Sequence, residues 1–407
     1  MTWHDLRREP YRLFFPLGVL SGCLGVGHWL ALGLQWIPAG SGFFHASVQL
    51  NAYLMGFILG FLMTALPRFA SAPPSSTPEL LAALGLFAGQ VLAAAGGWWV
   101  AAQACQVGLL VFLMVFAGRR FARRTGSAHP PTEFVWVPIA LLLGLTGSVL
   151  LGLGQGGFIP SYWLGLARPL AQQGFTLGIV LGVAGFMAPR LMGTAVLPVG
   201  MTPQQVMAVR WRRIRWHMAA GAVFTGSFVL EGAGRVQSAY VLRALVLTGV
   251  LTWTTRWYRR PVAQETYARL LWMSLWMIVL GVWSAALWPA YRIAMLHAVF
   301  IGGLSLMTFS VGTMVILSHA GEGTALRRPM GILRVVAAGV GIAVVARIRA
   351  DTQPETYFSW LAVASGAWLA AAIAWLVVMW PRCLRVPPSG TFERLHEAAK
   401  QVVLKPS

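Results

Sequence analysis

The sequence predicts an all-α, polytopic integral membrane protein, folded as a helical bundle of about twelve transmembrane helices. Of its 407 residues, 57% are hydrophobic and only 10% are charged, and the mean hydropathy is +0.68. Soluble proteins contain about a quarter charged residues, so this chain has too few to cover a water-facing surface. Its apolar stretches run continuously for about twenty residues and do not alternate, which excludes a β-barrel.

Apolar windows of helical length define the predicted spans. No linker is long enough to separate independently folded domains, so we expect a single transmembrane domain over residues 1–407. It has a short N-terminal segment, 1–12, and a C-terminal tail, 382–407, in which 390–405 forms either an amphipathic surface helix or a frayed end. The predicted spans are 13–36, 43–66, 78–98, 100–118, 134–154, 170–188, 216–233, 238–255, 268–287, 294–317, 330–346 and 358–380.

The arginines are distributed unequally between the two sides of this bundle. If the helices alternate in direction, the opposite side holds only Arg168, Arg235, Arg292, Arg347 and Arg349. Positive charge in short loops keeps those loops cytoplasmic, so we expect an even number of spans and both termini in the cytoplasm. The arginine-rich side holds Arg7, Arg8, Arg12, Arg68, Arg119, Arg120, Arg123, Arg124, Arg210, Arg212, Arg213, Arg215, Arg256, Arg259, Arg260, Arg327, Arg328, Arg382 and Arg385.

The same distribution accounts for the formal net charge of +20. In a soluble protein such a charge would indicate nucleic-acid binding, but here the charge lies in loops that orient the protein in a bilayer. We therefore expect the lipid bilayer as a partner and no nucleic acid. The three cysteines, Cys23, Cys105 and Cys383, are too few and too scattered for a disulfide framework or a paired-cysteine metal site.

Histidines are the main candidates for chemistry, because ionisable residues inside a bilayer are costly and mark function by default. His45 opens the second span, His297 lies near the start of the tenth, and His28 lies late in the first. The predicted orientation places all three in the outer half of the membrane. Histidines at one depth on several helices suit an axially ligated haem or a small metal site. The alternative is an interfacial histidine hydrogen-bonded to water or backbone.

Helical spacing after His45 gives one face that continues through Gln49 to Gly56 and Gly60. Gln49 lies one turn below His45, where it can orient the ring or bind a ligand. Gly56 and Gly60 form a GxxxG pattern that lets another helix backbone, or a flat macrocycle, approach closely. The helix that carries His297 has Ser305, Thr308 and Gly312 below it in the same way.

Two arginines on the charge-poor side complete the candidate site. Arg168 and Arg292 are expected on loops at the outer boundary, where they can pair with haem propionates or extend to the interface as ordinary arginines. Glu231 is expected to contact Arg235 one turn on, and Arg243 either reaches outward or pairs with Glu231. The spans contain almost no other acidic residues, which argues against a transporter built on membrane carboxylates.

Three segments resemble the NnrS family. They are EPYRLFFPLG, HASVQLNAYLMGFILGFLMTALPRF and LHAVFIGGLSLMTFSVGTMVILSHAGE. The resemblance implies a bacterial inner-membrane protein that contains haem and copper and is associated with nitric oxide and nitrosative stress. It also implies a distant kinship with the catalytic subunit of haem-copper oxidases, whose low-spin haem ligands lie on the second and tenth spans. His45 and His297 occupy those spans here.

This sequence departs from the family pattern at several positions. The pattern on the second helix is His-Ala-His-Glu-Met, and here Ser47, Val48 and Gln49 follow His45 and Ala46. On the tenth helix Gly312, Thr313 and Met314 stand where Met-Thr-Arg is usual, whereas His319 and Gly321 match the His-x-Gly ending. Because the missing residues are potential copper ligands, we expect haem on His45 and His297 and little copper.

The first functional hypothesis is therefore a haem protein acting in nitric oxide metabolism or stress resistance. Two strong axial histidines favour electron transfer with a membrane redox partner, and one labile ligand favours binding of a gas such as nitric oxide. Two alternatives belong to other classes: a multi-pass transporter of a small solute, and a cofactor-free assembly partner of a membrane reductase. Reduction of oxygen is not expected, because the sequence has no cluster of three histidines.

Overall fold

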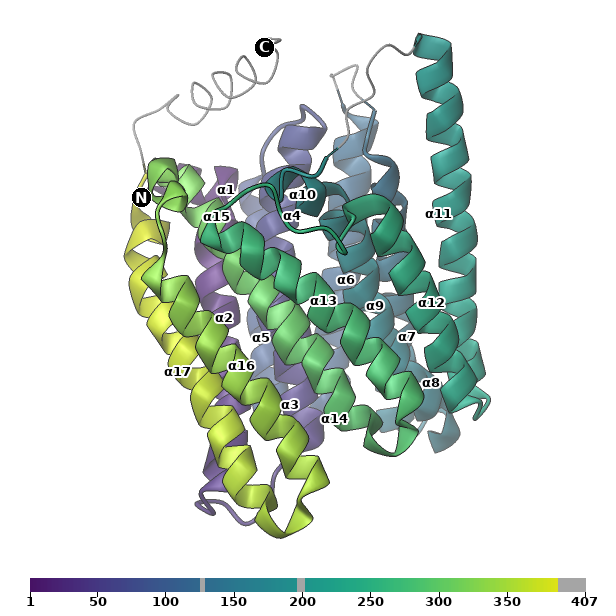
Figure 1. Ribbon diagram of the computed structural model, residues 1–407, viewed down its shortest axis with the longest axis vertical. Coiled ribbons are helices and arrows are strands. Elements are labelled where there is room, and N and C mark those ends of the chain that lie inside the picture. Colours follow the sequence, from purple (N-terminus) through teal and green to yellow (C-terminus); the bar gives the residue numbers. More distant parts are fainter. Residues whose placement is uncertain (125–128, 196–201, 387–407) are drawn as a thin grey trace.

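The computed structural model describes residues 1–124, 129–195 and 202–386, and over these residues the chain is helical and has no strand (Figure 1). The α-helices, in chain order, are α1 (Trp3–Arg8), α2 (Tyr11–Gly33), α3 (Gly42–Val48), α4 (Met55–Phe69), α5 (Thr77–Ala95), α6 (Trp99–Ala122), α7 (Trp136–Gln155), α8 (Leu164–Pro169), α9 (Phe175–Ile179), α10 (Gly185–Leu191), α11 (Pro203–Gly232), α12 (Val236–Thr255), α13 (Thr266–Leu287), α14 (Arg292–His297), α15 (Leu306–His319), α16 (Gly331–Thr352) and α17 (Tyr357–Leu384).

The prediction of a polytopic helical bundle is confirmed. Within the described residues, 11 helices are long and apolar enough to cross a membrane. The expected span 216–233 falls in α11, which lies along the edge of the bundle (Figure 1) but is less apolar because its first half carries Arg210, Arg212, Arg213 and Arg215. The segment 390–405, expected as a surface helix or a frayed end, lies outside the described residues.

Helix ends are fixed locally by capping residues. Ser76 caps α5, where its hydroxyl accepts a hydrogen bond from the Glu79 N–H (3.3 Å) and the Glu79 carboxylate accepts one from the Ser76 N–H (2.8 Å). This reciprocal arrangement satisfies two N–H groups that the first turn leaves open. The same carboxylate accepts a hydrogen bond from Arg120 of α6 (2.6 Å), so one residue starts α5 and joins it to the next span.

Three spans are more buried than the others, and each contains π-helical turns. A π-helix closes i→i+5 hydrogen bonds and occurs mostly as short insertions in α-helices, frequently at functional sites. The three spans are Gly42–Phe69, Ser161–Leu191 and Pro289–His319. Their π-helical segments are Gln49–Leu54 in the first, Leu170–Gly174 and Val180–Ala184 in the second, and Ala298–Ser305 in the third.

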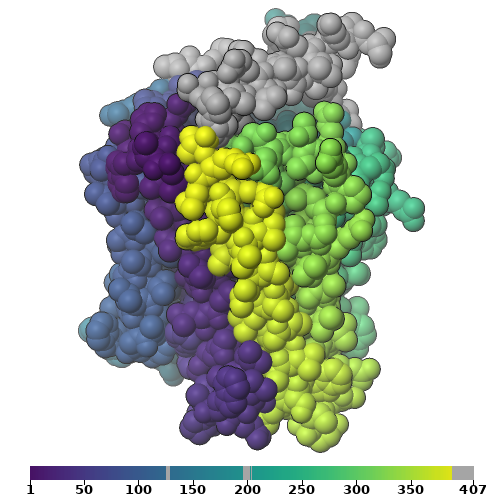
Figure 2. Space-filling view, turned by 90° about the vertical axis from the view of Figure 1, so that its left-hand side faces the viewer, coloured from purple at the N-terminus to yellow at the C-terminus, as the bar shows by residue number. Residues whose placement is uncertain are grey.

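Helix packing repeats three times around the bundle. In each group of four consecutive helical passes, the first packs on the second, the third packs on the fourth, and the fourth packs on the first of the next group. The joins between groups are α6 with α7, α12 with α13, and α17 with α2. Figure 2 shows the last join, with the N-terminal helix beside α17. In every group the second member is the span with π-helical turns.

Gly56 and Gly60 of α4 face α2 and let the two backbones approach. A Cβ atom at Gly56 would lie 2.7 Å from the carbonyl oxygen of Phe14 and 2.8 Å from Cα of Gly18. A Cβ atom at Gly60 would lie 2.9 Å from Cα of Tyr11. The GxxxG pattern therefore serves helix packing, and the macrocycle alternative for these two glycines is not supported.

We expect Gly56→Ala to destabilise the protein by about 1–3 kcal/mol, because the added methyl group overlaps backbone atoms of α2. Gly85→Ala on α5 is the matched control, since a Cβ atom there meets nothing within 4 Å. The measurement is the melting temperature of the detergent-purified protein. Equal melting temperatures for the two variants would contradict the close contact between α2 and α4.

Candidate functional site

A cavity of about 850 Å³ lies between the three spans that carry π-helical turns. This volume falls in the range of small-molecule and cofactor sites. Five of the six predicted site residues line it: His45, Gln49, Arg168, Arg292 and His297. Residues from the second and tenth spans, far apart in sequence, therefore meet at one site. Aromatic rings of Trp29, Phe43, Tyr53, Tyr240, Phe300, Tyr357 and Trp368 also line the cavity.

His45 is oriented by the backbone of α2. Its Nδ1 lies 3.1 Å from the carbonyl oxygen of Gly25, which can only accept a hydrogen bond, so Nδ1 carries the proton. Gln49 Nε2 donates to the carbonyl oxygen of Gly22 at 2.7 Å. Gln49 thus anchors its helix to α2 rather than orienting His45. Nε2 is left as the His45 ring nitrogen that can bind a ligand from the cavity.

His297 has the same arrangement on the other side of the cavity. Its Nδ1 lies 2.7 Å from the carbonyl oxygen of Ile293, one turn earlier in α14, and so carries the proton. The two spans are joined directly, because the hydroxyl groups of Tyr53 and Thr308 lie 2.6 Å apart. Each histidine thus presents an unprotonated Nε2, which is the form of imidazole that coordinates metals.

His28 occupies a different position. Its Nε2 accepts a hydrogen bond from the Ser41 N–H at 2.7 Å, which ties the end of α2 to the residue that caps α3. It is not among the residues that line the cavity. Coordination by His28, predicted from the sequence, would require this hydrogen bond to break, and the bond gives the ring a structural role in the loop.

The four residues of the face predicted from His45 to Gly60 all lie against α2. His45 and Gln49 bond to the carbonyl oxygens of Gly25 and Gly22 and also line the cavity. Gly56 and Gly60 pack on the same helix further along. The segment between the two pairs, Gln49–Leu54, is π-helical, which the α-helical spacing used for the prediction did not include.

The two arginines predicted on loops lie in helices. Arg168 is in α8, within a span that begins at Ser161, earlier than expected, and Arg292 is the first residue of α14. The cavity is also lined by Arg347, which the sequence analysis placed on the same side but did not include in the site. Arg347 is held by Asp351 one turn on, at 2.6 Å.

A buried arginine, Arg243, lies behind another part of the wall. Arg243 is fully buried and contacts Glu231 at 2.7 Å, so the expected pairing of Glu231 with Arg235 is replaced by the alternative. Arg243 also donates to Gln173 Oε1 at 2.6 Å, and its guanidinium group lies 3.9 Å from the ring centre of Phe228. Glu231, Gln173 and Tyr240 line the cavity. The pairing of Glu231 with Arg243 was one of the alternatives predicted from the sequence. The contact of Arg243 with Gln173, 70 residues earlier in the chain, was not predicted.

Comparison with protein families identifies the family of this chain. The model of the NnrS protein family matches residues 5–386. The chain belongs to the NnrS family. A comparison with curated proteins finds no match. Membership in the NnrS family identifies the chain, at the level of the family, as a multi-pass membrane protein related to nitric oxide.

The His-x-Gly ending that resembles the NnrS family has a structural role at the opposite end of the bundle from the cavity. His319 Nδ1 lies 2.7 Å from a carboxylate oxygen of Glu9. Arg12 and Arg68 also contact that carboxylate, at 2.5 and 3.1 Å. Glu9 thus joins α2, α4 and α15, the helices that continue to the two cavity histidines.

The donor set of the cavity bears on which cofactor fits it. Among the described residues, no group of three or more histidine, cysteine, aspartate or glutamate side chains is placed to hold a metal ion. Two histidines, several aromatic side chains and three arginines line one cavity, and these residue types can hold the iron, the ring and the propionates of a haem. The residues present therefore fit haem, and Ser47 and Val48 supply no copper ligand.

The Glu9 cluster predicts a pH dependence of stability. Burial raises the pKa of Glu9, but hydrogen bonds and charges from His319 and Arg12 outweigh it and lower the pKa from 4.5 to about 2. The carboxylate therefore contributes stability above pH 4.5, on the order of 2–3 kcal/mol, which is lost as pH falls toward 2. We expect Glu9→Gln to lower the melting temperature at pH 6, and the difference from wild type to disappear near pH 2. A difference that stays constant with pH would contradict this assignment.

Proposed function

We propose that this NnrS-family chain binds haem in the 850 Å³ cavity and acts in nitric oxide metabolism or nitrosative stress resistance. The supporting observation is that His45 and His297, on two distant spans, line one cavity with their Nδ1 protons fixed by backbone carbonyls. Histidines that served only to cap the backbone would not need to face the same cavity. A purely structural role for the two histidines would also leave unexplained why three arginines line the same cavity.

Each part of the site has a role in this proposal. Haem iron supplies gas binding or one-electron transfer. His45 and His297 are the residues that would hold the iron, and the carbonyl oxygens of Gly25 and Ile293 keep their Nε2 atoms unprotonated. Arg168, Arg292 and Arg347 supply positive charge for the propionates. Apolar and aromatic side chains such as Phe300, Leu361 and Trp368 line much of the remaining wall, beside polar groups such as Gln173 and Glu231.

The proposal includes a location and an orientation. We infer that the protein lies in the bacterial inner membrane with both termini in the cytoplasm, because the arginine-rich loops belong on that side. The chain enters the bundle at α2 and leaves it at α17 at the same end, which is consistent with an even number of passes (Figure 1). In this orientation the cavity opens toward the outer half of the membrane, where a membrane redox partner would exchange electrons with it.

A visible absorption spectrum of the detergent-purified protein tests the function. The protein is expressed with an adequate haem supply, and the reduced-minus-oxidised spectrum is recorded. We expect a Soret band, and a shift of that band when nitric oxide is added if one coordination position is open. A colourless protein would overturn the proposal. Metal analysis of the same sample is expected to find substoichiometric copper.

A further inference from the structure

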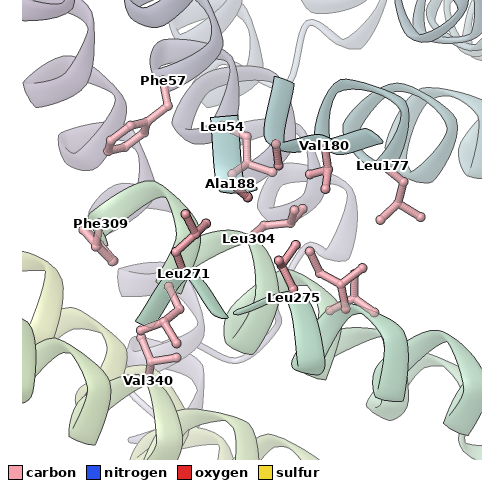
Figure 3. Close-up of a cluster of buried hydrophobic side chains, with 14 of the residues drawn as sticks. Leu54, Phe57, Leu177, Val180, Ala188, Leu271, Leu275, Leu304, Phe309 and Val340 are labelled. Atoms are coloured by element: carbon pink, nitrogen blue, oxygen red, sulfur yellow. The ribbon is translucent and has the colours of Figure 1, made fainter. Parts of the chain in front are cut away.

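A second cavity, of about 120 Å³, lies directly beside the first. It is surrounded by residues of all three spans that carry π-helical turns, and of α2 and α13. Leu54 lines both cavities, so the two are adjacent at this side chain. Figure 3 shows Leu54, Val180, Ala188, Leu271 and Leu304 converging on this region from different helices.

The wall of the second cavity is almost entirely apolar. Thr176 and Thr308 are its only residues with polar side chains. The Thr176 hydroxyl donates to the carbonyl oxygen of Gln172 at 2.5 Å, and the Thr308 hydroxyl bonds to Ser305 at 2.9 Å and to Tyr53 at 2.6 Å. Both hydroxyl groups are therefore satisfied by protein. A buried water needs two to four polar partners, and this cavity offers none, so it stays dry.

The size of the cavity defines what it can hold. A dry apolar cavity of about 150 Å³ binds benzene or xenon, and the 120 Å³ here is close to that volume. An ion or polar solute would lose its hydration there without compensation. A small uncharged gas molecule meets both limits, because it fits the volume and has little hydration to lose.

We propose that the 120 Å³ cavity is a binding site for a small uncharged gas, held next to the histidine-lined cavity with Leu54 as the partition. The identity of that gas as nitric oxide rests on the proposed function, but the capacity to bind an apolar atom or diatomic molecule does not. In this arrangement gas accumulates in the apolar core of the bundle and enters the histidine-lined cavity by displacement of one leucine side chain. That leucine ends the π-helical segment of its span.

Xenon is the probe for this site. The ¹²⁹Xe chemical shift is measured in the detergent-solubilised protein over a range of xenon pressures, with protein-free micelles as the reference. Wild type is expected to show a saturable shift. Ala184→Leu fills the cavity and is expected to remove the saturable component, whereas Ala82→Leu, on an exposed face of α5, is the matched control and keeps it.

A second variant keeps the test independent of folding defects in Ala184→Leu. Val311→Ala enlarges the same cavity and is expected to keep or strengthen xenon binding. No saturable shift in wild type, or an unchanged shift in Ala184→Leu, would overturn the proposal. Because the xenon measurement needs no haem, a colourless protein that binds xenon refutes the proposed function alone, and a haem protein that does not bind xenon refutes the gas site alone.

Discussion

Replacing either cavity histidine with alanine is expected to lower the haem content of the purified protein by about tenfold or more. Loss of a group that merely supports a metal ligand costs roughly 10–100-fold in affinity, and loss of the ligand itself is expected to cost at least as much. His45→Ala and His297→Ala remove Nε2 atoms that line one cavity. The measurement is the Soret absorbance per mole of protein, with the fold checked by size-exclusion chromatography.

The chain supplies its own control for this experiment. His28→Ala removes a histidine at similar depth whose Nε2 is bonded to the Ser41 N–H and which lies off the cavity. We expect it to keep wild-type haem content. Added imidazole is expected to restore the Soret band in His45→Gly and His297→Gly, because free imidazole can occupy the position of the missing ring. Equal spectra for wild type, His45→Ala and His297→Ala would refute haem ligation by these residues.

Removing the buried arginine is expected to cost about 3–5 kcal/mol of stability. Arg243 has no exposed surface and its partner Glu231 is 9% exposed, so Arg243→Ala leaves a carboxylate buried without its counter-charge. It also removes the hydrogen bond to Gln173 and the contact with Phe228. The melting temperature in detergent should fall well below that of wild type.

Two comparisons isolate the buried charge as the cause. Arg235→Ala removes an exposed arginine one turn from Glu231 and is expected to leave the melting temperature nearly unchanged. The double variant Arg243→Met/Glu231→Leu removes both charges, and buried pairs replaced in this way often retain or gain stability. We expect it to recover much of the loss. If the double variant is less stable than Arg243→Ala, packing of the arginine, and not its charge, dominates.

Hydrophobic run length was enough to predict the eleven helices that, in the described part of the chain, are long and apolar enough to cross a membrane, though not the lower apolarity of α11 at the predicted span 216–233. The 30 Å hydrocarbon core of a bilayer sets the length of each helix, so stretches such as 43–66 and 268–287 identify helices that the structure places at Gly42–Phe69 and Thr266–Leu287. The span that begins at Ser161 was predicted to begin at 170. Arg168 falls inside it, and a charged residue interrupts an apolar window even where the helix continues.

The sequence also indicated which polar residues belong to the candidate site, because polar residues are rare in these spans. His45, His297, Gln49, Arg168 and Arg292 do line one cavity. The hydrogen bond from Gln49 to the carbonyl oxygen of Gly22 could not be predicted, because Gly22 belongs to another helix. The position of Arg347 at the cavity could not be predicted either. Its spacing from Asp351 is that of an ordinary surface salt bridge.

Sequence by itself determined which segments lie in the membrane, because the cost of burying charge and backbone in lipid acts on each segment alone. Tertiary structure decided what faces the cavity. The π-helical segment Gln49–Leu54 was not predicted, and the Nδ1 protons are fixed by carbonyl oxygens that carry no side-chain signature. Those features depend on how helices distant in sequence pack against one another, and an apolar helix leaves the choice of packing partner open.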